Sequence, residues 1–332
     1  MTVRRTAVSI TVAAAITVLL TSCSTGGTDS TGRTNSAGAG PHTKPVANAS
    51  SSVNKSTWPQ ATPTAGLAKG LSLPLEAYME TYQDTVALDD AERHLETQCM
   101  ADYGLHISFP PAGQNPPPNA DDSNMPRRYG ITDQAMAEKY GYGLPDSIQH
   151  QEGTRMPELT KEQIEVLTGR TGIRNSPADP APAKAPSAYH GKQIHKDGCA
   201  GWADDQIGSR NLDFSLVSRL DGESLTQSQQ TPAVHSAITA WSTCMSSKGY
   251  TVDTPYHADE IVPHTDGSPS KEEIAVAVAD IGCKKSTDLV KTWFTEDSRI
   301  QERQIKDHQT ELDALRTRRT RTVDAAQKTL NG

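Results

Sequence analysis

The chain has 332 residues, of which 35% are hydrophobic and 5% aromatic, and a formal net charge of −8 at pH 7. This negative balance argues against a nucleic-acid-binding protein and against attachment to anionic lipid by charge. The low aromatic content predicts a modest apolar core that needs further stabilisation, for which disulfide bonds are a common means.

Residues 1–22 are typical of a secretory signal peptide. Two arginines precede an apolar stretch from Ala7 to Leu20, which is shorter than a membrane span and ends in small residues. The run Leu20-Thr21-Ser22-Cys23 resembles the lipobox of bacterial lipoproteins. That resemblance implies that Cys23 carries a diacylglyceryl group, becomes the mature N-terminus and holds the protein on the membrane by its acyl chains.

Residues 23–70 are predicted to form a lipidated cysteine followed by a disordered tether. The stretch is rich in Ser, Thr, Gly, Ala, Pro and Asn and contains almost no apolar residue. Such a segment cannot bury enough surface to offset the entropy lost on ordering. A core is therefore expected only in the residues that follow.

Four further cysteines, Cys99, Cys199, Cys244 and Cys283, are even in number. On the outer side of a membrane such thiols oxidise, so we expect two disulfides. Zinc is disfavoured because no C-x-x-C pair exists and the smallest gap is far wider than structural zinc spacing. No metal or other cofactor is predicted. Four cysteines allow three pairings.

The first half of the predicted globular part contains one long helix and two short ones. Apolar residues at spacings of three and four run from Leu75 to Tyr103, and Gly104 follows as a helix stop. A short extended piece and a proline-rich loop come next. Thr132 and Thr160 are the expected N-caps of the two short helices.

The second half has clearer helix signals. Thr231-Pro232 supplies a cap and a proline at the first helical position, and Gly249 ends the predicted helix. Ser270-Lys271-Glu272-Glu273 has the form of a capping box and opens a segment of about 60 residues without proline. We expect a single long C-terminal helix there. Its second half keeps only a narrow apolar stripe, which is typical of a projecting or coiled-coil helix.

An internal repeat favours one disulfide pairing. Cys99-Met100-x-x-x-Gly104 is echoed by Cys244-Met245-x-x-x-Gly249, and a short extended piece follows each. Gly198-Cys199 and Gly282-Cys283 each follow a nearby aspartate, and each is expected to begin a helical stretch. We infer a duplicated unit in which a helix is bonded to a later helix, with bridges from Cys99 to Cys199 and from Cys244 to Cys283.

The repeated stretches and three others resemble a group of secreted lipoproteins from high-GC Gram-positive bacteria such as streptomycetes. The resemblance spans most of the mature chain. It implies the compartment and the architecture, and it carries over no catalytic or binding residue. The three other stretches are Arg128-Tyr129-Gly130, Tyr140-Gly141-Tyr142-Gly143 and Trp241-Ser242-Thr243-Cys244-Met245.

Candidate catalytic sites are each better explained by structure. Ser268-Pro269-Ser270-Lys271 matches the S-x-x-K pattern of penicillin-binding enzymes, but the companion motifs are missing and Ser270 is expected to cap a helix. The acidic pairs Asp121-Asp122 and Asp204-Asp205 are adjacent residues, which cannot straddle a glycosidic bond. Every cysteine has a better explanation than a catalytic thiol.

Two histidine-containing stretches are weak metal-site candidates. His257-x-Asp259 and His264-x-Asp266 surround Glu260, but the flanking prolines predict a solvated surface loop. His190 and His195, which flank Lys192, are weaker still. The only basic cluster comprises Arg316, Arg318, Arg319 and Arg321 and is expected to wrap around a solvated helix end, with anionic wall polymer or lipid head groups as the sharper alternative.

The sequence thus predicts a mainly α-helical domain with two disulfides, short extended pieces and a long C-terminal helix. Two helical cysteine-pair units are expected, at 71–229 and 230–332. The expected function is that of a membrane-anchored, extracytoplasmic, non-enzymatic component of the cell envelope. It would interact with an envelope protein or with itself through the C-terminal helix, and not with nucleic acid. The alternatives are capture of a wall fragment or small solute near Tyr129, Tyr140 and Tyr142, and, least favoured, an envelope hydrolase.

Overall fold

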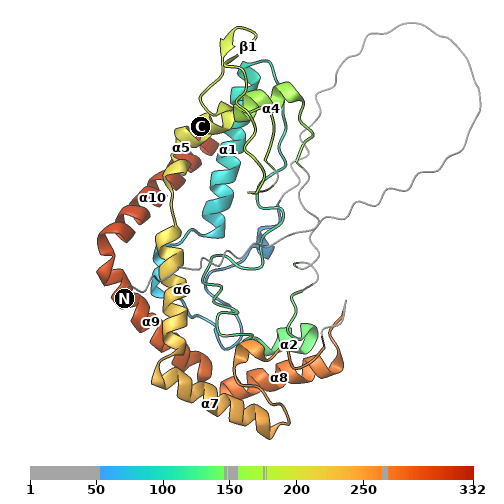
Figure 1. The fold of residues 1–332 in the computed structure, drawn as a ribbon, viewed down its shortest axis with the longest axis vertical. Helices are drawn as coiled ribbons and strands as arrows, with labels where there is room; N and C mark the ends of the chain where they lie inside the picture. The colour runs from blue at the N-terminus through green and yellow to red at the C-terminus, as the bar shows by residue number, and fades with distance from the viewer. Residues whose placement is uncertain (1–52, 146–147, 149–155, 175, 177, 264–267) are drawn as a thin grey trace, which may run out of the picture. The chain divides into compact units, whose positions relative to one another are not determined.

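A computed structural model describes residues 53–332 apart from 146–147, 149–155, 175, 177 and 264–267 (Figure 1). The predicted signal peptide, Cys23 and most of the predicted tether lie outside the described residues. The described end of that tether, residues 53–70, is folded, since Ala68 is fully buried in the main apolar cluster and Leu67 packs against it, which corrects the prediction that the core begins only after residue 70. The mainly helical class is confirmed, and the described strands are one antiparallel pair, β1 (Ala188–Tyr189) and β2 (Lys192–Gln193). No described helix is long and apolar enough to cross a bilayer.

The first long helix, α1 (Tyr82–Asp102), begins seven residues later than predicted. Residues 74–78 form a separate 3-10 turn, and Thr81 then starts α1 with a capping box. Its side chain accepts from the backbone N–H of Asp84, and the Asp84 carboxylate accepts from the backbone N–H of Thr81. The capping box satisfies two backbone donors and so stabilises a helix start at this position.

The short helices are confirmed, with one cap corrected. The helix α4 (Lys161–Thr168) has the expected capping box between Thr160 and Gln163 and ends at Gly169. The helix α2 (Gln134–Tyr140) is capped by Asp133, and Thr132 is buried one residue earlier with its hydroxyl donating to the Pro126 carbonyl. A carboxylate accepts better from helix N–H groups than a hydroxyl, which favours the aspartate.

The remaining helices follow one another closely along the chain. Thr231 caps α7 as expected, with Pro232 at its first position. The bounds are α5 (Gly198–Ile207), α6 (Ser215–Gln229), α7 (Pro232–Ser247), α8 (Lys271–Ser286), α9 (Leu289–Asp307) and α10 (Gln309–Asn331).

The prediction of one C-terminal helix of about 60 residues is wrong, because the segment is three helices. The first break lies at Thr287 and Asp288, where Asp288 adopts the left-handed conformation with φ of 51°. The second lies at His308. Aspartate tolerates the left-handed region better than most residues, at a cost of about 1 kcal/mol. The turns let α8, α9 and α10 bury their apolar faces against different parts of the chain.

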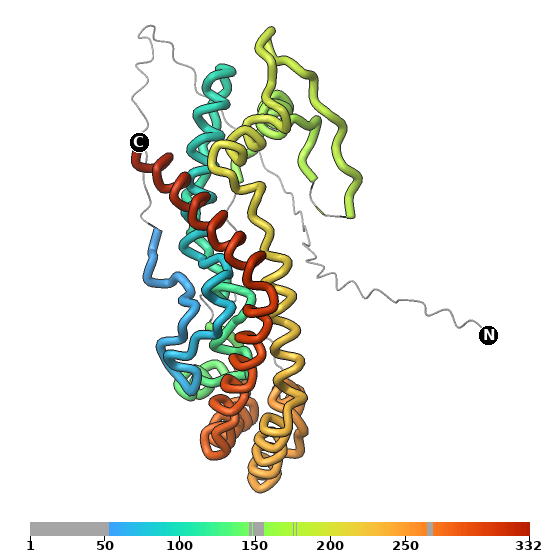
Figure 2. The backbone as a smooth tube through the Cα atoms, turned by 90° about the vertical axis from the view of Figure 1, so that its left-hand side faces the viewer, coloured from blue at the N-terminus to red at the C-terminus, as the bar shows by residue number. Residues whose placement is uncertain are grey.

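The last helix, α10, does not project from the described chain. Its buried residues Leu312 and Leu315 pack with Leu75 and Tyr78, and Ala326 packs with residues of α1 and α5. Figure 2 shows α10, in dark red, running beside α1. The narrow apolar stripe is therefore covered by the chain's own helices, which corrects the prediction of a projecting helix.

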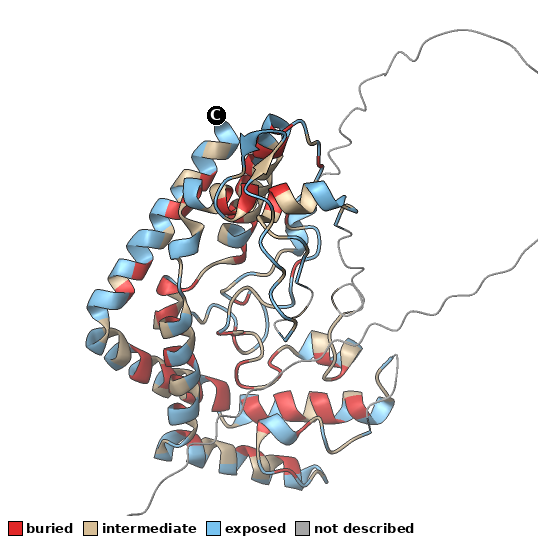
Figure 3. Cartoon of the chain, turned by 45° about the horizontal axis from the view of Figure 1, so that its top comes forward, coloured by how far each residue is buried: buried red, intermediate tan, exposed pale blue. Residues whose placement is uncertain are grey.

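The main apolar cluster lies where α7, α8 and α9 meet. Trp241 and Trp293 are both fully buried in it, with Val276 and Leu289 between the helices. Helix α9 also packs along α6. Figure 3 shows buried and exposed positions alternating along these helices, as expected for amphipathic segments around shared cores.

Both predicted disulfides are confirmed, Cys99–Cys199 and Cys244–Cys283. The repeat is also visible in the backbone, because the two helix ends form the same turn. The Leu105 N–H donates to the Met100 carbonyl at 3.0 Å, and the Tyr250 N–H donates to the Met245 carbonyl at 3.0 Å. In each turn the glycine has a positive φ, the conformation that a helix-ending glycine supplies.

The second cysteines are less alike than the repeat predicted. Cys199 is the second residue of α5, as expected of a cysteine that begins a helix. Cys283 lies near the end of α8, not at a helix start. The two units thus share the first helix and its turn. They differ in the second helix, because the bonded cysteine lies at the N-terminal end of α5 and near the C-terminal end of α8.

Removing either disulfide should lower the free energy of unfolding. The bonds close loops of 100 and 39 residues, for which chain entropy gives about 5 and about 4 kcal/mol. Chemical denaturation of Cys99→Ala/Cys199→Ala and Cys244→Ala/Cys283→Ala measures these losses. Wild-type protein under reductant serves as the reference for losing both. Equal stability of all four samples would contradict the expectation.

Candidate functional site

The densest set of buried polar side chains surrounds Arg128. Its Nε donates to Asp297 Oδ2 at 2.7 Å, and its Nη1 donates to Asp221 Oδ2 at 2.8 Å. The three side chains are 5% exposed or less. The guanidinium also donates to the Ser224 hydroxyl and to the Asp221 carbonyl. One arginine thus joins α6 and α9 through two carboxylates.

Neighbouring groups complete this Arg128 network, which we define as Arg128 with Tyr129, Asp221, Ser224, Asp297 and Gln301. The Tyr129 hydroxyl donates to Asp297 Oδ2 at 2.9 Å, and the Gln301 amide donates to Asp221 Oδ1 at 3.0 Å. Burial raises the pKa of Asp221, while Arg128 opposes that rise. These hydrogen bonds offset the free-energy cost of removing the three charged groups from water.

A second buried ion pair lies on α8 and contacts the same segment three residues after Arg128, at Ile131. Lys284 Nζ donates to Asp280 Oδ2 at 3.0 Å and to the Ile131 carbonyl at 2.9 Å, and both side chains are fully buried. Burial lowers the pKa of Lys284 and raises that of Asp280. Gly130 has φ of 77°, and a Cβ there would lie 2.6 Å from Lys284 Nζ. Only glycine lets the segment pass this close.

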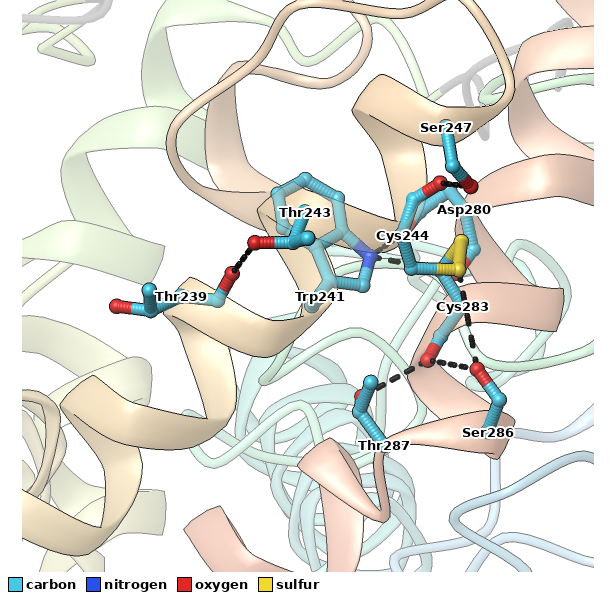
Figure 4. The surroundings of a disulfide bond; sticks show 9 residues. All are labelled: Thr239, Trp241, Thr243, Cys244, Ser247, Asp280, Cys283, Ser286 and Thr287. Carbon is cyan, nitrogen blue, oxygen red and sulfur yellow. Dashed lines mark hydrogen bonds between the residues drawn. A yellow bond between two sulfur atoms is a disulfide. The ribbon is translucent and has the colours of Figure 1, made fainter.

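The surroundings of the Cys244–Cys283 bond adjoin this second pair (Figure 4). Trp241 on α7 donates through Nε1 to Asp280 Oδ1 at 2.9 Å, and the hydroxyls of Ser286 and Thr287 donate to the Cys283 carbonyl. The disulfide, the tryptophan and the ion pair therefore fix α7 against α8. Every cysteine among the described residues is bonded, which leaves no thiol there for catalysis.

The tyrosines predicted to mark a ligand region have different surroundings. Tyr129 is fully buried and stacks on Trp293 with ring centroids 5.1 Å apart. Tyr140 and Tyr142 are half-buried, and the backbone N–H of Tyr142 donates to Glu273 Oε1 at 3.0 Å. Tyr129 is a buried member of the main apolar cluster and Tyr142 packs against that cluster, which does not include Tyr140. Tyr129 belongs to the Arg128 network, and Tyr142 anchors its loop to α8.

Ser270 caps α8, as the S-x-x-K stretch was predicted to do. Its hydroxyl accepts from the backbone N–H of Glu273 at 3.0 Å. The expected reciprocal bond is missing among the described contacts, because the Glu273 carboxylate accepts from Tyr142 instead. The predicted capping box is therefore only half formed, and its glutamate holds a tertiary contact.

The histidine stretches do not form a metal centre in the described chain. His257 Nδ1 lies 2.9 Å from Asp253 Oδ1, and both side chains are more than half exposed. His264 and Asp266 lie outside the described residues. His195 stacks on Trp202, while His190 packs edge-on against its neighbour Tyr189. The described residues contain no group of three or more potential metal ligands.

The acidic and basic clusters also have structural partners. The Asp122 carboxylate accepts from the Ser218 hydroxyl, and Asp204 pairs with Arg210 at 2.9 Å. Among the basic cluster, Arg316 pairs with Asp313 at 2.6 Å and lies over the Tyr78 ring. Arg319 donates to the Met79 carbonyl. Arg318 and Arg321 are exposed.

A row of partly buried carboxylates runs along α1 toward α5. Burial raises the pKa of Glu96 from its ordinary value of 4.5 to about 7, with further contributions from the negative charges of Glu92, Asp204 and Asp89. Arg93 opposes the rise. The carboxyl of Glu96 therefore takes up a proton near neutral pH.

Sequence reasoning missed the two buried ion pairs. Asp280 and Lys284 are spaced four apart within an apolar helical run, which is the signal that could have revealed them. Arg128 was noted only as part of a resemblance. Its partners Asp221 and Asp297 are 93 and 169 residues away, and no local pattern marks them.

Comparisons with known proteins identify no relative. No protein-family model matches the chain, and neither the curated proteins nor the solved structures contain a match.

Replacing Asp297 by asparagine should destabilise the fold by about 3 kcal/mol, because Arg128 would lose one of its two buried counter-charges. Chemical denaturation at neutral pH measures the loss. The control is Asp307→Asn, on the exposed side of the same helix, which should stay within about 0.5 kcal/mol of wild type. Similar losses for the two variants would show that the Arg128 network contributes little.

The raised pKa of Glu96 predicts a pH-dependent stability. Between about pH 4.5 and about pH 7 the folded chain holds a proton that the unfolded chain has lost, so the free energy of unfolding falls as pH rises through this window. Glu96→Gln escapes that loss. It should exceed wild-type stability by about 1 to 3 kcal/mol at about pH 8 and show no such gain near pH 4.

The matched control for this titration is Glu302→Gln, which removes an exposed carboxylate of α9. Its stability should follow the wild-type pH profile. Denaturation midpoints at several pH values test the comparison, and a gain for Glu96→Gln that does not vary with pH would argue against protonation of this group.

Proposed function

We propose that the protein is a lipid-anchored, extracytoplasmic component of the bacterial cell envelope that acts by interaction and not by catalysis. The observation that carries the proposal is the run ending in Cys23, behind a basic start and a short apolar stretch. Such a leader directs export, and acylation of the cysteine retains the product on the membrane.

The two disulfides support this location. Bonds between distant cysteines persist outside the cytosol and are rare within it. They join residues 100 and 39 positions apart, which is the arrangement that stabilises a chain with a modest apolar core. An oxidising compartment explains why four cysteines are retained in a fold with only 5% aromatic residues.

The use of the reactive side chains supports a non-catalytic role. Ser270 caps a helix, and the carboxylates of Asp221, Asp280 and Asp297 are buried in ion pairs that join helices. A catalytic acid or nucleophile needs access to a substrate. These groups are occupied by the fold, so the proposed activity resides in exposed surface.

The proposed partner surface is the outer face of α10. Its inner face is covered by α1 and α5, while Arg318, Arg321 and Lys328 are exposed on the opposite side. Because Glu311 and Asp324 are also exposed on this helix, the surface carries both signs of charge and suits an envelope protein or a second copy with a complementary charge pattern. Crosslinking in intact cells from a photoreactive residue at Arg321 would identify the occupant.

Cys23→Ser should release the protein from the membrane, because the hydroxyl cannot receive the thioether-linked lipid. Fractionation of cells followed by detection of the protein measures the shift from membrane to medium. Ser24→Ala, one residue further on, is the matched control and should remain with the membrane. Membrane retention of the Cys23→Ser chain would reject a lipid anchor at this position.

A further inference from the structure

Two adjacent arginines have opposite surroundings in this fold. Arg128 points into the core between two carboxylates, whereas Arg127 lines a cavity of about 470 Å³. The cavity lies between residues 56–65 and residues 124–145. Its volume is within the range of sites for small organic ligands, roughly 300 to 1,000 Å³.

More than half of the cavity wall is apolar, and uncharged polar side chains such as Gln60, Asn124 and Thr132 complete it. Trp58, Ile131, Met136, Ala137 and Leu144 contribute carbon surface from several segments of the chain. The indole nitrogen of Trp58 donates to the Gly113 carbonyl at 3.0 Å, which fixes the ring at the cavity edge. A ligand with an apolar body would remove this surface from water.

Arg127 is the only basic residue among the described residues that line the cavity. It donates to the carbonyls of Tyr142 and Gly143, which uses two of the five N–H groups of a guanidinium. No ion pair is formed between Arg127 and a carboxylate among the described residues, although the negative charge of Asp259 does act on the guanidinium. Burial lowers the pKa of Arg127, and the charge of Asp259 opposes that fall.

The single acidic residue in the described lining does not supply a counter-charge to Arg127. Asp133 Oδ1 accepts from the backbone N–H groups of Ala135 and Met136 at 2.9 and 3.3 Å. Its charge is therefore used to cap α2. The cavity combines apolar walls with one cation that lacks a carboxylate partner, which is the complement of a molecule with an apolar body and one anionic group.

We propose that this cavity binds a small amphipathic anion, with its acidic group on Arg127 and its apolar body between Trp58 and Met136. Tyr129, Tyr140 and Tyr142 are not among the lining residues, although much of the wall comes from the same stretch of the chain, residues 124–145. The proposal is independent of where Cys23 places the chain.

Fluorescence titration of the full chain carrying Cys23→Ser tests the proposal without detergent. The probe is anilinonaphthalene sulfonate, an apolar ring system with one negative charge, used with dodecanoate below its micelle concentration as competitor. We expect saturable binding of one probe per chain and its displacement by dodecanoate. Dodecyltrimethylammonium, which has the same tail and the opposite charge, should not displace it. Vesicles of phosphatidylglycerol separate a free acid from a lipid head group as the source, because only the free acid is expected to compete.

Two variants locate the site. Arg127→Gln should weaken probe binding about tenfold, since a charge-assisted contact is lost. Arg303→Gln, which removes an exposed arginine of α9 away from the cavity lining, should leave it unchanged. Thr62→Glu, at an exposed lining position, should weaken binding roughly three- to tenfold by repulsion, while Thr62→Gln should not.

The Thr62 pair keeps the test decisive if Arg127→Gln fails to fold, because the pair differs only in charge on an exposed side chain. Absence of saturable binding, displacement by the cationic detergent, or equal affinity for Thr62→Glu and Thr62→Gln would each overturn the proposal. A membrane-bound Cys23→Ser chain that still binds the probe would reject the lipid anchor and leave this site standing.

Discussion

The salt bridges from Arg128 to Asp221 and Asp297 are the constraint on which the arrangement of the helices depends. They join a non-helical segment to α6 and α9 in a region where none of the charges meets solvent. Desolvation of an isolated charge costs several kcal/mol, so each group is tolerable only while the other two are in place. Any other placement of α9 against α6 would leave a buried charge without its partner.

The same segment continues into the second buried pair. Three residues after Arg128, the Ile131 carbonyl accepts from Lys284, which is paired with Asp280 on α8. Residues 128–131 thus connect α6, α8 and α9 through ionic and hydrogen-bonded contacts. The Cys244–Cys283 bond adds a covalent link from α7 to α8. Buried ion pairs and disulfides therefore stabilise the arrangement of the helices in a chain that has only three phenylalanines for its apolar core.

The polar residues fall into two groups, those that stabilise the fold and those that are proposed to contact a partner or ligand. The buried carboxylates and Ser270 form contacts within the fold, and the exposed face of α10 is proposed as a partner surface. Arg127 differs, because it is half-buried, faces a cavity and lacks a carboxylate partner in the described chain. Adjacent residues of one type thus have different roles because the backbone turns their side chains to opposite sides.

Local signals in the sequence determined the helical class, several caps and both disulfides. Thr160, Thr231 and Ser270 cap helices because a hydroxyl beside a helix start satisfies a backbone donor, and the repeated turn at Gly104 and Gly249 identified the pairing. Tertiary structure decided what local patterns do not encode. The C-terminal segment is broken at Asp288 and His308, so that three helices bury separate faces. The Glu273 carboxylate accepts from the backbone N–H of Tyr142 and not from the start of its own helix. Tertiary structure also brought Arg128 to carboxylates far away in the chain, because burial of charge is settled only when distant segments meet.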